Sequence, residues 1–283
     1  TADLIEGLKE LPYIRVKSSN DGVLTNSVLE AHRINSEYVM KESRRITTNN
    51  GHRKVAEKSF NEEFATEIGY EKDGRVDWQK FHCGLFKYDL NSLIHGCFLE
   101  EIGGRLRATR ALSGFVEASG VVVAESGGVK NNIVQPELKG GEGNVPFPRT
   151  EFVAKEIKAY FNLDLALLRG YGLPDNATKL LIALSLFKVR RFLSTGLRLR
   201  TACDLDMVGD LTVTRPNGFM ISEEKALLQE CKRLIASCKP LFADPIITEV
   251  EWKPTKKKGK EKTGDSEQPA PDENDEDKEE NGE

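Results

Sequence analysis

Two short motifs in the sequence alternate arginine with an apolar residue. GGRLR contains Arg105 and Arg107, and LRLR contains Arg198 and Arg200. On an extended strand, residues two positions apart point to the same face, so each motif places two arginines side by side. Such rows can follow the phosphates of a nucleic acid, or they can be charged strand edges that discourage aggregation. Because the same pattern occurs twice, we predict that these arginines contact the phosphates of a nucleic acid.

Four further residues are candidates for contact with a polyanion. Arg110 follows the first arginine pair, and Lys130 lies in SGGVKNN, whose glycines favour a turn at a hairpin tip. That turn could approach a phosphate backbone closely, or it could be a plain connection. His32 and Arg33 are adjacent in an expected helix and could bind phosphate, while His32 could also serve in acid–base chemistry.

Three more cations, Lys188, Arg190 and Arg191, fall near the expected end of a helix. Cations there are stabilised by the helix dipole by ~0.3–1 kcal/mol. We therefore expect these three to have a structural role and not to bind RNA.

The sequence shows no arrangement of residues that requires catalysis. His95 and His32 stand without a Cys-His or Ser-His-Asp pattern, and the glycine stretches lack the spacing of a phosphate-binding Walker loop. The five cysteines are scattered without paired short spacings, which fits reduced thiols. We expect no enzymatic activity, no metal and no cofactor.

Charge is distributed unevenly along the chain. The formal net charge is -4, but residues 253–283 hold seven of the 41 basic residues and eleven of the 45 acidic ones. The remainder, residues 1–252, is therefore neutral, with 34 residues of each sign. Any polyanion must be bound by local basic clusters. Residues 253–283 contain no large apolar side chain and are predicted to be a disordered tail.

The expected localisation is cytoplasmic. No run of about 18 apolar residues is present to span a membrane, and the first residues lack the pattern of a signal peptide.

The second half of the chain reads as alternating strands and helices. The pattern predicts an α+β fold with a ferredoxin-like sheet and helices on one face, an architecture frequent in RNA-binding proteins. The expected elements are a strand over 150–168, a helix over 175–196, strands over 197–206 and 210–214, a helix over 222–239 and a strand over 246–252.

The first half is less regular. Ser27 and Glu30 have the spacing of a capping box, which predicts a helix as far as Met40. Residues 41–75 are polar and resemble a projecting insertion more than core. Residues 76–99 look helical in two pieces, with a break near Asp89.

Several long segments resemble a known family. KYDLNSLIHGCFLEEIGGRLRATRALSGFVEASGVVVAESGGVKNN, GEGNVPFPRTEF, AYFNLDLALLRGYGL, LLIALSLFKVRRF and GLRLRTACDL are similar to the Cas-seven-type (RAMP superfamily) backbone subunit of type I-G, formerly I-U, CRISPR effector (Cascade) complexes. The resemblance runs from about residue 25 to residue 245.

The resemblance implies an RRM-like palm over 1–252, with a finger-like insertion at 41–75 and a thumb near 120–148. It further implies a non-catalytic scaffold in antiviral defence, whose copies stack head to tail along CRISPR RNA and present it to target DNA beside other effector subunits. The aromatic RNA-recognition signature is absent, so stacking of bases on the sheet is not expected.

Two alternatives remain open from the residues alone. The chain could be a metal-independent endoribonuclease acting on CRISPR repeats, with His32 or His95 as general acid or base. It could also be a non-enzymatic interaction protein whose acidic tail mimics nucleic acid.

Overall fold

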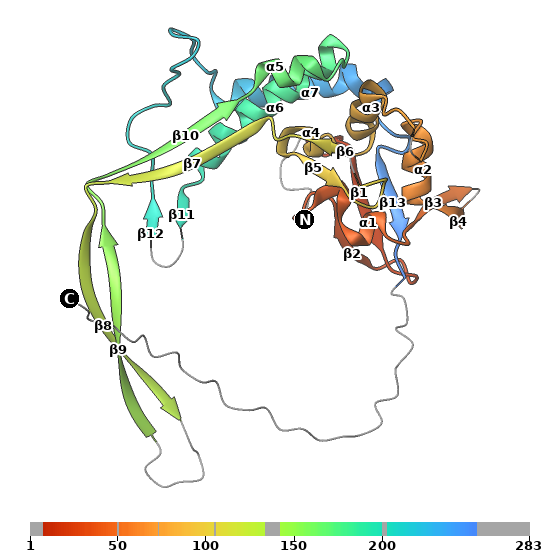
Figure 1. The fold of residues 1–283 in the computed structure, drawn as a ribbon. Coiled ribbons are helices and arrows are strands. Elements are labelled where there is room, and N and C mark those ends of the chain that lie inside the picture. The colour runs from red at the N-terminus through yellow and green to blue at the C-terminus, as the bar shows by residue number, and fades with distance from the viewer. Residues whose placement is uncertain are drawn as a thin grey trace, which may run out of the picture. The chain divides into compact units, whose positions relative to one another are not determined.

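The computed structural model of the protein describes residues 8–49, 51–72, 74–104, 106–133, 142–199 and 203–253 (Figure 1). Its strands are β1 (Tyr13–Lys17), β2 (Val23–Asn26), β3 (Arg44–Asn49), β4 (His52–Ser59), β5 (Cys97–Leu99), β6 (Leu106–Ala108), β7 (Leu112–Ser119), β8 (Val122–Ile133), β9 (Glu142–Val153), β10 (Glu156–Leu163), β11 (Leu197–Leu199), β12 (Cys203–Leu205) and β13 (Ile247–Glu251). Its helices are η1 (Arg33–Asn35), α1 (Glu37–Met40), α2 (Phe60–Glu67), α3 (Trp78–Asp89), α4 (Asn91–His95), α5 (Leu165–Gly170), α6 (Asp175–Ser194), α7 (Glu224–Cys238) and η2 (Lys239–Leu241). No helix of the described ranges is long and apolar enough to cross a membrane.

The largest sheet has five strands in the order β2-β1-β13-β3-β4. β1 pairs in parallel with β13, while the other neighbours are antiparallel. Ile14 and Val16 of β1 and Val250 of β13 are fully buried. Because side chains alternate across a strand, these residues define the face that packs on the helices. The α+β class and the palm-like mixed sheet with helices are therefore confirmed.

The origin of the sheet strands differs from the prediction. We expected the second half of the chain to build the sheet, but four of the five strands come from residues 13–59 and only β13 comes from the other end. The strand expected at 246–252 is confirmed. Residues 210–214, expected as a strand, form none.

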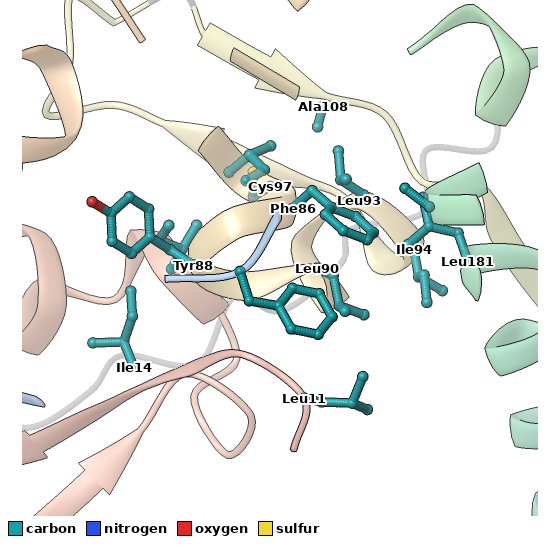
Figure 2. Packing of buried hydrophobic residues seen from close by; sticks show 14 of the residues in the cluster. Leu11, Ile14, Phe86, Tyr88, Leu90, Leu93, Ile94, Cys97, Ala108 and Leu181 are labelled. Atoms are coloured by element: carbon teal, nitrogen blue, oxygen red, sulfur yellow. The ribbon is translucent and has the colours of Figure 1, made fainter. Parts of the chain in front are cut away.

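A helical layer closes the core of the protein. α3 and α1 pack on β1, and α2 packs on α3. Figure 2 shows the resulting packing, in which aromatic and aliphatic side chains from α3, α4 and the first strand interdigitate. The predicted break between two helical pieces is confirmed, since α3 ends at Asp89 and α4 begins at Asn91.

The segment predicted as a projecting insertion contributes to this core. Within residues 41–75, β3 and β4 belong to the five-stranded sheet, and α2 buries Phe60 and Phe64 completely. α2 begins with a capping box in which Ser59 and Glu62 exchange hydrogen bonds. The polar sequence of this segment therefore did not indicate that one face of α2 is buried.

The helix expected from Ser27 to Met40 is wrong over most of its length. The Ser27 hydroxyl accepts a hydrogen bond from the Ile14 amide at 3.1 Å, so Ser27 extends the pairing of β1 with β2. Glu30 accepts hydrogen bonds from the Thr25 and Ser36 hydroxyls. Only η1 and the short α1 are helical, because the polar groups of the supposed cap have tertiary partners.

The middle of the chain forms two antiparallel ribbons. β7 pairs with β10, and β8 pairs with β9 over their full lengths. The expected strand over 150–168 is thus divided among β9, β10 and α5. SGGVKNN was predicted as a turn, but Gly127 pairs with Pro148 and Lys130 with Val145 inside the ribbon. The connection of β8 to β9 lies outside the described residues.

The remaining helices match their predictions closely. α6 covers Asp175–Ser194 and is followed by Gly196 at a φ of 75°, a conformation that favours glycine. Pro174 is the N-cap residue of α6. α7 covers Glu224–Cys238. The expected strand over 197–206 is the β11–β12 hairpin, and the predicted tail lies outside the described residues except for Lys253.

Four cysteines whose side chains the structure describes are free thiols. Cys83 is exposed, and Cys97, Cys231 and Cys238 are buried. Burial raises the pKa of the Cys97 and Cys231 thiols to about 12, so both stay protonated near neutral pH.

Candidate nucleic-acid interface

The first arginine motif lies on a short hairpin formed by β5 and β6. Leu99 and Leu106 are fully buried and pair with each other across the hairpin. Phe98 and Arg107 form the pair on the opposite, outward face, where Phe98 is 45% exposed and Arg107 is exposed. The alternation predicted around Leu106 is therefore confirmed, while Arg105 lies outside the described residues.

Two contacts with neighbouring residues support the turn that closes this hairpin. The Asn61 side-chain amide donates to the Glu101 carbonyl at 3.3 Å. Gly103 has a φ of 67°, and a Cβ at this position would lie 1.7 Å from the Tyr70 hydroxyl oxygen. The backbone can lie this close to Tyr70 only because residue 103 is glycine. The hairpin consequently presents its outer face on a fixed support.

Two basic residues that are far apart in sequence lie close to Gly96, which follows α4. Arg33 donates to the Gly96 carbonyl at 2.7 Å and to the His95 carbonyl at 3.3 Å. A Cβ on Gly96 would lie 3.1 Å from both the Ala108 carbonyl oxygen and the Arg110 amide nitrogen. Arg33 and Arg110, both predicted as RNA contacts, therefore lie at the same turn.

A polar network lies beneath this turn. The Lys188 ammonium donates to the Asn91 side-chain oxygen at 2.6 Å, and its nitrogen lies 2.8 Å from His95 Nε2. Asp89 is completely buried and accepts hydrogen bonds from the Ser92 hydroxyl at 2.9 Å and the Asn91 amide at 3.2 Å. The network joins α3 and α4 to α6.

Positive charge is in excess at this turn. Burial, and then Lys188, Arg33 and Arg110 in that order, lower the pKa of His95 to about 3, so its ring is neutral. Burial raises the pKa of Asp89 to about 6, and Asp89 is still mainly ionised at neutral pH. One carboxylate thus faces three cations, which is the electrostatic requirement for holding an anion. We call Arg33, Arg107, Arg110 and Lys188 the basic cluster.

The network predicts a pH dependence of stability. Burial lowers the pKa of Lys188 to about 8, whereas the pKa of a lysine in the unfolded chain is about 10.5. Between these values the unfolded chain binds the extra proton, so stability rises with pH. We expect the free energy of unfolding of the wild type, relative to Lys188→Met, to increase by about 3 kcal/mol from pH 8 to pH 10.5.

Urea denaturation at a series of pH values measures this difference. Lys179→Met is the control, because Lys179 is exposed and pairs with Asp175 on the helix surface at 2.6 Å. Its curve should run parallel to that of the wild type. A Lys188→Met curve that also runs parallel would show that Lys188 is not held in this environment.

The structure corrects the interpretation of Lys188. Sequence reasoning grouped it with Arg190 and Arg191 at the helix end, but Lys188 points into the network described above. Arg190 pairs with Asp210 at 2.7 Å and Arg191 with Glu224 at 3.0 Å, so those two have structural partners as expected. The spacing of residues in the sequence could not indicate the buried environment of Lys188, because its partners, Asn91 and His95, are on α4.

No described contact places the other residues predicted to bind RNA at this turn. His32 is exposed and immediately precedes η1. Lys130 lies in β8 and Arg198 in β11, and nothing is described of their side chains. Arg200 lies outside the described residues. The two arginine motifs are therefore on separate hairpins.

The open face of the five-stranded sheet offers less free positive charge. Glu249 pairs with Arg15 at 3.2 Å and with Lys17 at 2.8 Å. Glu251 pairs with Arg53 at 2.5 Å. By contrast, Arg107 and Arg110 form no ion pair with any residue that the structure describes. The hairpin is consequently a better anion-binding surface than the sheet.

One family model matches the first part of the chain. An α+β chain with a net-positive turn of this kind is suited to bind a polyanion. Residues 2–123 match the family model described as CRISPR-associated protein GSU0053. The match includes Arg33, Phe98, Arg107 and Arg110, and it supports a CRISPR-associated protein. No curated protein matches the chain.

Proposed function

We propose that the protein is a CRISPR RNA-binding backbone subunit, which stacks head to tail along the guide RNA and presents it for pairing with target DNA. The observation that carries the proposal is the basic cluster, in which Arg107 and Arg110 are exposed without ion-pair partners among the described residues. Free arginines on a rigid support suit phosphate contacts that ignore base sequence. In this proposal CRISPR RNA, further copies of the chain and other effector subunits are the partners.

The resemblance of the sequence to backbone subunits supports the assembly part of the proposal. Head-to-tail interfaces have no closing symmetry and generate open helical filaments, as a guide-coating subunit needs. The long ribbon of β8 and β9 coincides with the expected thumb near 120–148. The assignment of 41–75 as the finger is a weaker part of the proposal, because β3 and β4 are sheet strands.

The environment of His95 is unfavourable to the endoribonuclease alternative. A general acid or base works best with a pKa near the operating pH, but that of His95 is lowered to about 3. Its Nε2 also lies within hydrogen-bond distance of Lys188. We therefore propose a structural role for His95, which leaves His32 as the remaining candidate of the endoribonuclease alternative; the proposed backbone subunit itself is non-enzymatic.

The salt dependence of RNA binding tests the proposal. Arg107→Ala and Arg110→Ala should each weaken the binding of unrelated single-stranded RNAs alike, because phosphate contacts carry no sequence information. Each should also reduce the slope of log affinity against log salt by ~0.7, the value for one phosphate contact on a single strand. Fluorescence anisotropy with two guides of different sequence measures both effects.

Arg233→Ala is the matched control. Arg233 is an equally exposed arginine, but on α7 it is paired with Glu230 at 2.5 Å. Its loss should leave the slope unchanged. A loss of affinity confined to one guide would mean that the arginines read bases, and a wild-type protein that does not bind RNA would overturn the proposed function.

A further inference from the structure

The outer face of the β5–β6 hairpin carries a partly exposed aromatic ring. Phe98 is 45% exposed, although both of its strand neighbours, Cys97 and Leu99, are buried. Its cross-strand partner is Arg107. Side chains directly opposite each other in an antiparallel pair have Cβ atoms only ~5 Å apart. The ring and the guanidinium therefore share one small surface.

Phenylalanine and arginine are two of the side chains on which unpaired bases stack in complexes with single-stranded RNA. A single exposed apolar residue is ordinary, but here the ring adjoins an arginine that has no ion-pair partner within the described chain. Arg110 and Arg33 lie at the same turn, where they can neutralise the phosphate of a nucleotide. The combination of stacking surface and positive charge fits a nucleotide better than it fits an apolar protein surface.

The support of the hairpin favours this use. Leu99 and Leu106 anchor its inner face in the core. Gly103 of its turn packs closely against Tyr70, and the Tyr171 hydroxyl oxygen lies 3.1 Å from the Leu93 carbonyl oxygen and 3.2 Å from that of Thr109, so it can donate to either. A surface that is already ordered loses little conformational entropy when a ligand binds.

We propose that Phe98 forms a stacking platform for one unpaired base of the bound RNA, with Arg107 and Arg110 at the adjoining phosphates. This inference rests on the proposed function and extends it to the base. Stacking uses the face of a base, so its Watson–Crick edge stays free for pairing with target DNA. The platform accepts any base, because every base has a π-face.

The test compares an oligouridylate with an abasic strand of the same length and backbone. On the full-length protein, Phe98→Ala should weaken oligouridylate binding by about 5- to 100-fold, the loss expected for one stacked base. The salt slope should stay that of the wild type, because no phosphate contact is removed. Binding of the abasic strand should be unchanged. Phe98→Trp should retain affinity, whereas Phe98→Leu, which keeps apolar area without a π-face, should not.

Phe219→Ala is the control, since Phe219 is a similarly exposed phenylalanine, at 49%, outside the hairpin. Thermal melting of each variant verifies folding. The platform is refuted if Phe98→Ala behaves as Phe219→Ala does, if Phe98→Leu binds fully, or if the abasic strand loses the same affinity. These results would leave the proposed function intact provided that Arg107→Ala still lowers the salt slope. A wild type that binds neither strand would overturn both.

Discussion

Asp89→Asn should destabilise the protein by about 1–3 kcal/mol at pH 7.5, because an amide offers one accepting oxygen where the buried Asp89 carboxylate uses two, for the Ser92 hydroxyl and the Asn91 backbone amide. Burial raises the pKa of Asp89 to about 6 and outweighs the nearby cations Lys188 and Arg33. Asparagine has nearly the same volume, so the loss reports on the polar contacts of this side chain and not on a cavity. Guanidinium denaturation monitored by circular dichroism measures the change.

Two comparisons make this expectation specific. Asp175→Asn removes an exposed carboxylate that pairs with Lys179 on the surface of α6, and it should change stability by less than about 0.5 kcal/mol. At pH 5 the destabilisation by Asp89→Asn should grow by about 1 kcal/mol, because the pKa of Asp89 is about 6 in the folded state, above its unfolded value, so the folded wild type gains stability as it takes up a proton. An effect of equal size at both pH values would contradict the raised pKa of Asp89.

The second large effect is expected for Gly96→Ala. Gly96 has a φ of 79° and a ψ of 154°, a conformation populated almost only by glycine. The added Cβ would also press against the backbone of Ala108 and Arg110, which cannot rotate away. We expect a loss of about 2–4 kcal/mol, together with weaker RNA binding, because the turn that carries Arg33 and Arg110 must shift.

Gly51→Ala separates the two causes. Gly51 also has a φ of 79°, but a Cβ there would have no neighbour within 4 Å. Its substitution should cost about 1–2 kcal/mol and leave RNA affinity unchanged. If Gly96→Ala loses stability but binds RNA as the wild type does, Gly96 supports the fold without positioning the basic cluster.

Elements with strong local signals could be predicted from the sequence. α6 has a long apolar run that ends just before Gly196, and the break between α3 and α4 is visible at Asp89. The strand β13 was also predicted, but its pairing with β1 was not. Arg15 and Glu249, which form an ion pair between β1 and β13, are 234 positions apart in sequence. No local pattern encodes a pairing of that range, so the sheet was assigned to the wrong half of the chain.

The site was predicted in the same partial way. The alternation of Leu106 and Arg107 follows from the period of a strand and was recognised. Phe98 was missed because an aromatic residue in an apolar run looks like core, and its exposure depends on the register of β5 with β6. Lys188 was misread because its buried environment is supplied by Asn91 and His95 across two helices.

The position of β13 in the middle of the sheet also constrains the order of events during synthesis. β1 and β3 flank β13, so the sheet remains split until Ile247–Glu251 has left the ribosome. The interval between β4 and β13 takes roughly 10–40 s to translate at typical rates. During this time each half presents a bare strand edge, the kind of surface that pairs with other chains. The nascent protein thus depends on what shields these edges, a requirement that the completed sheet no longer reveals.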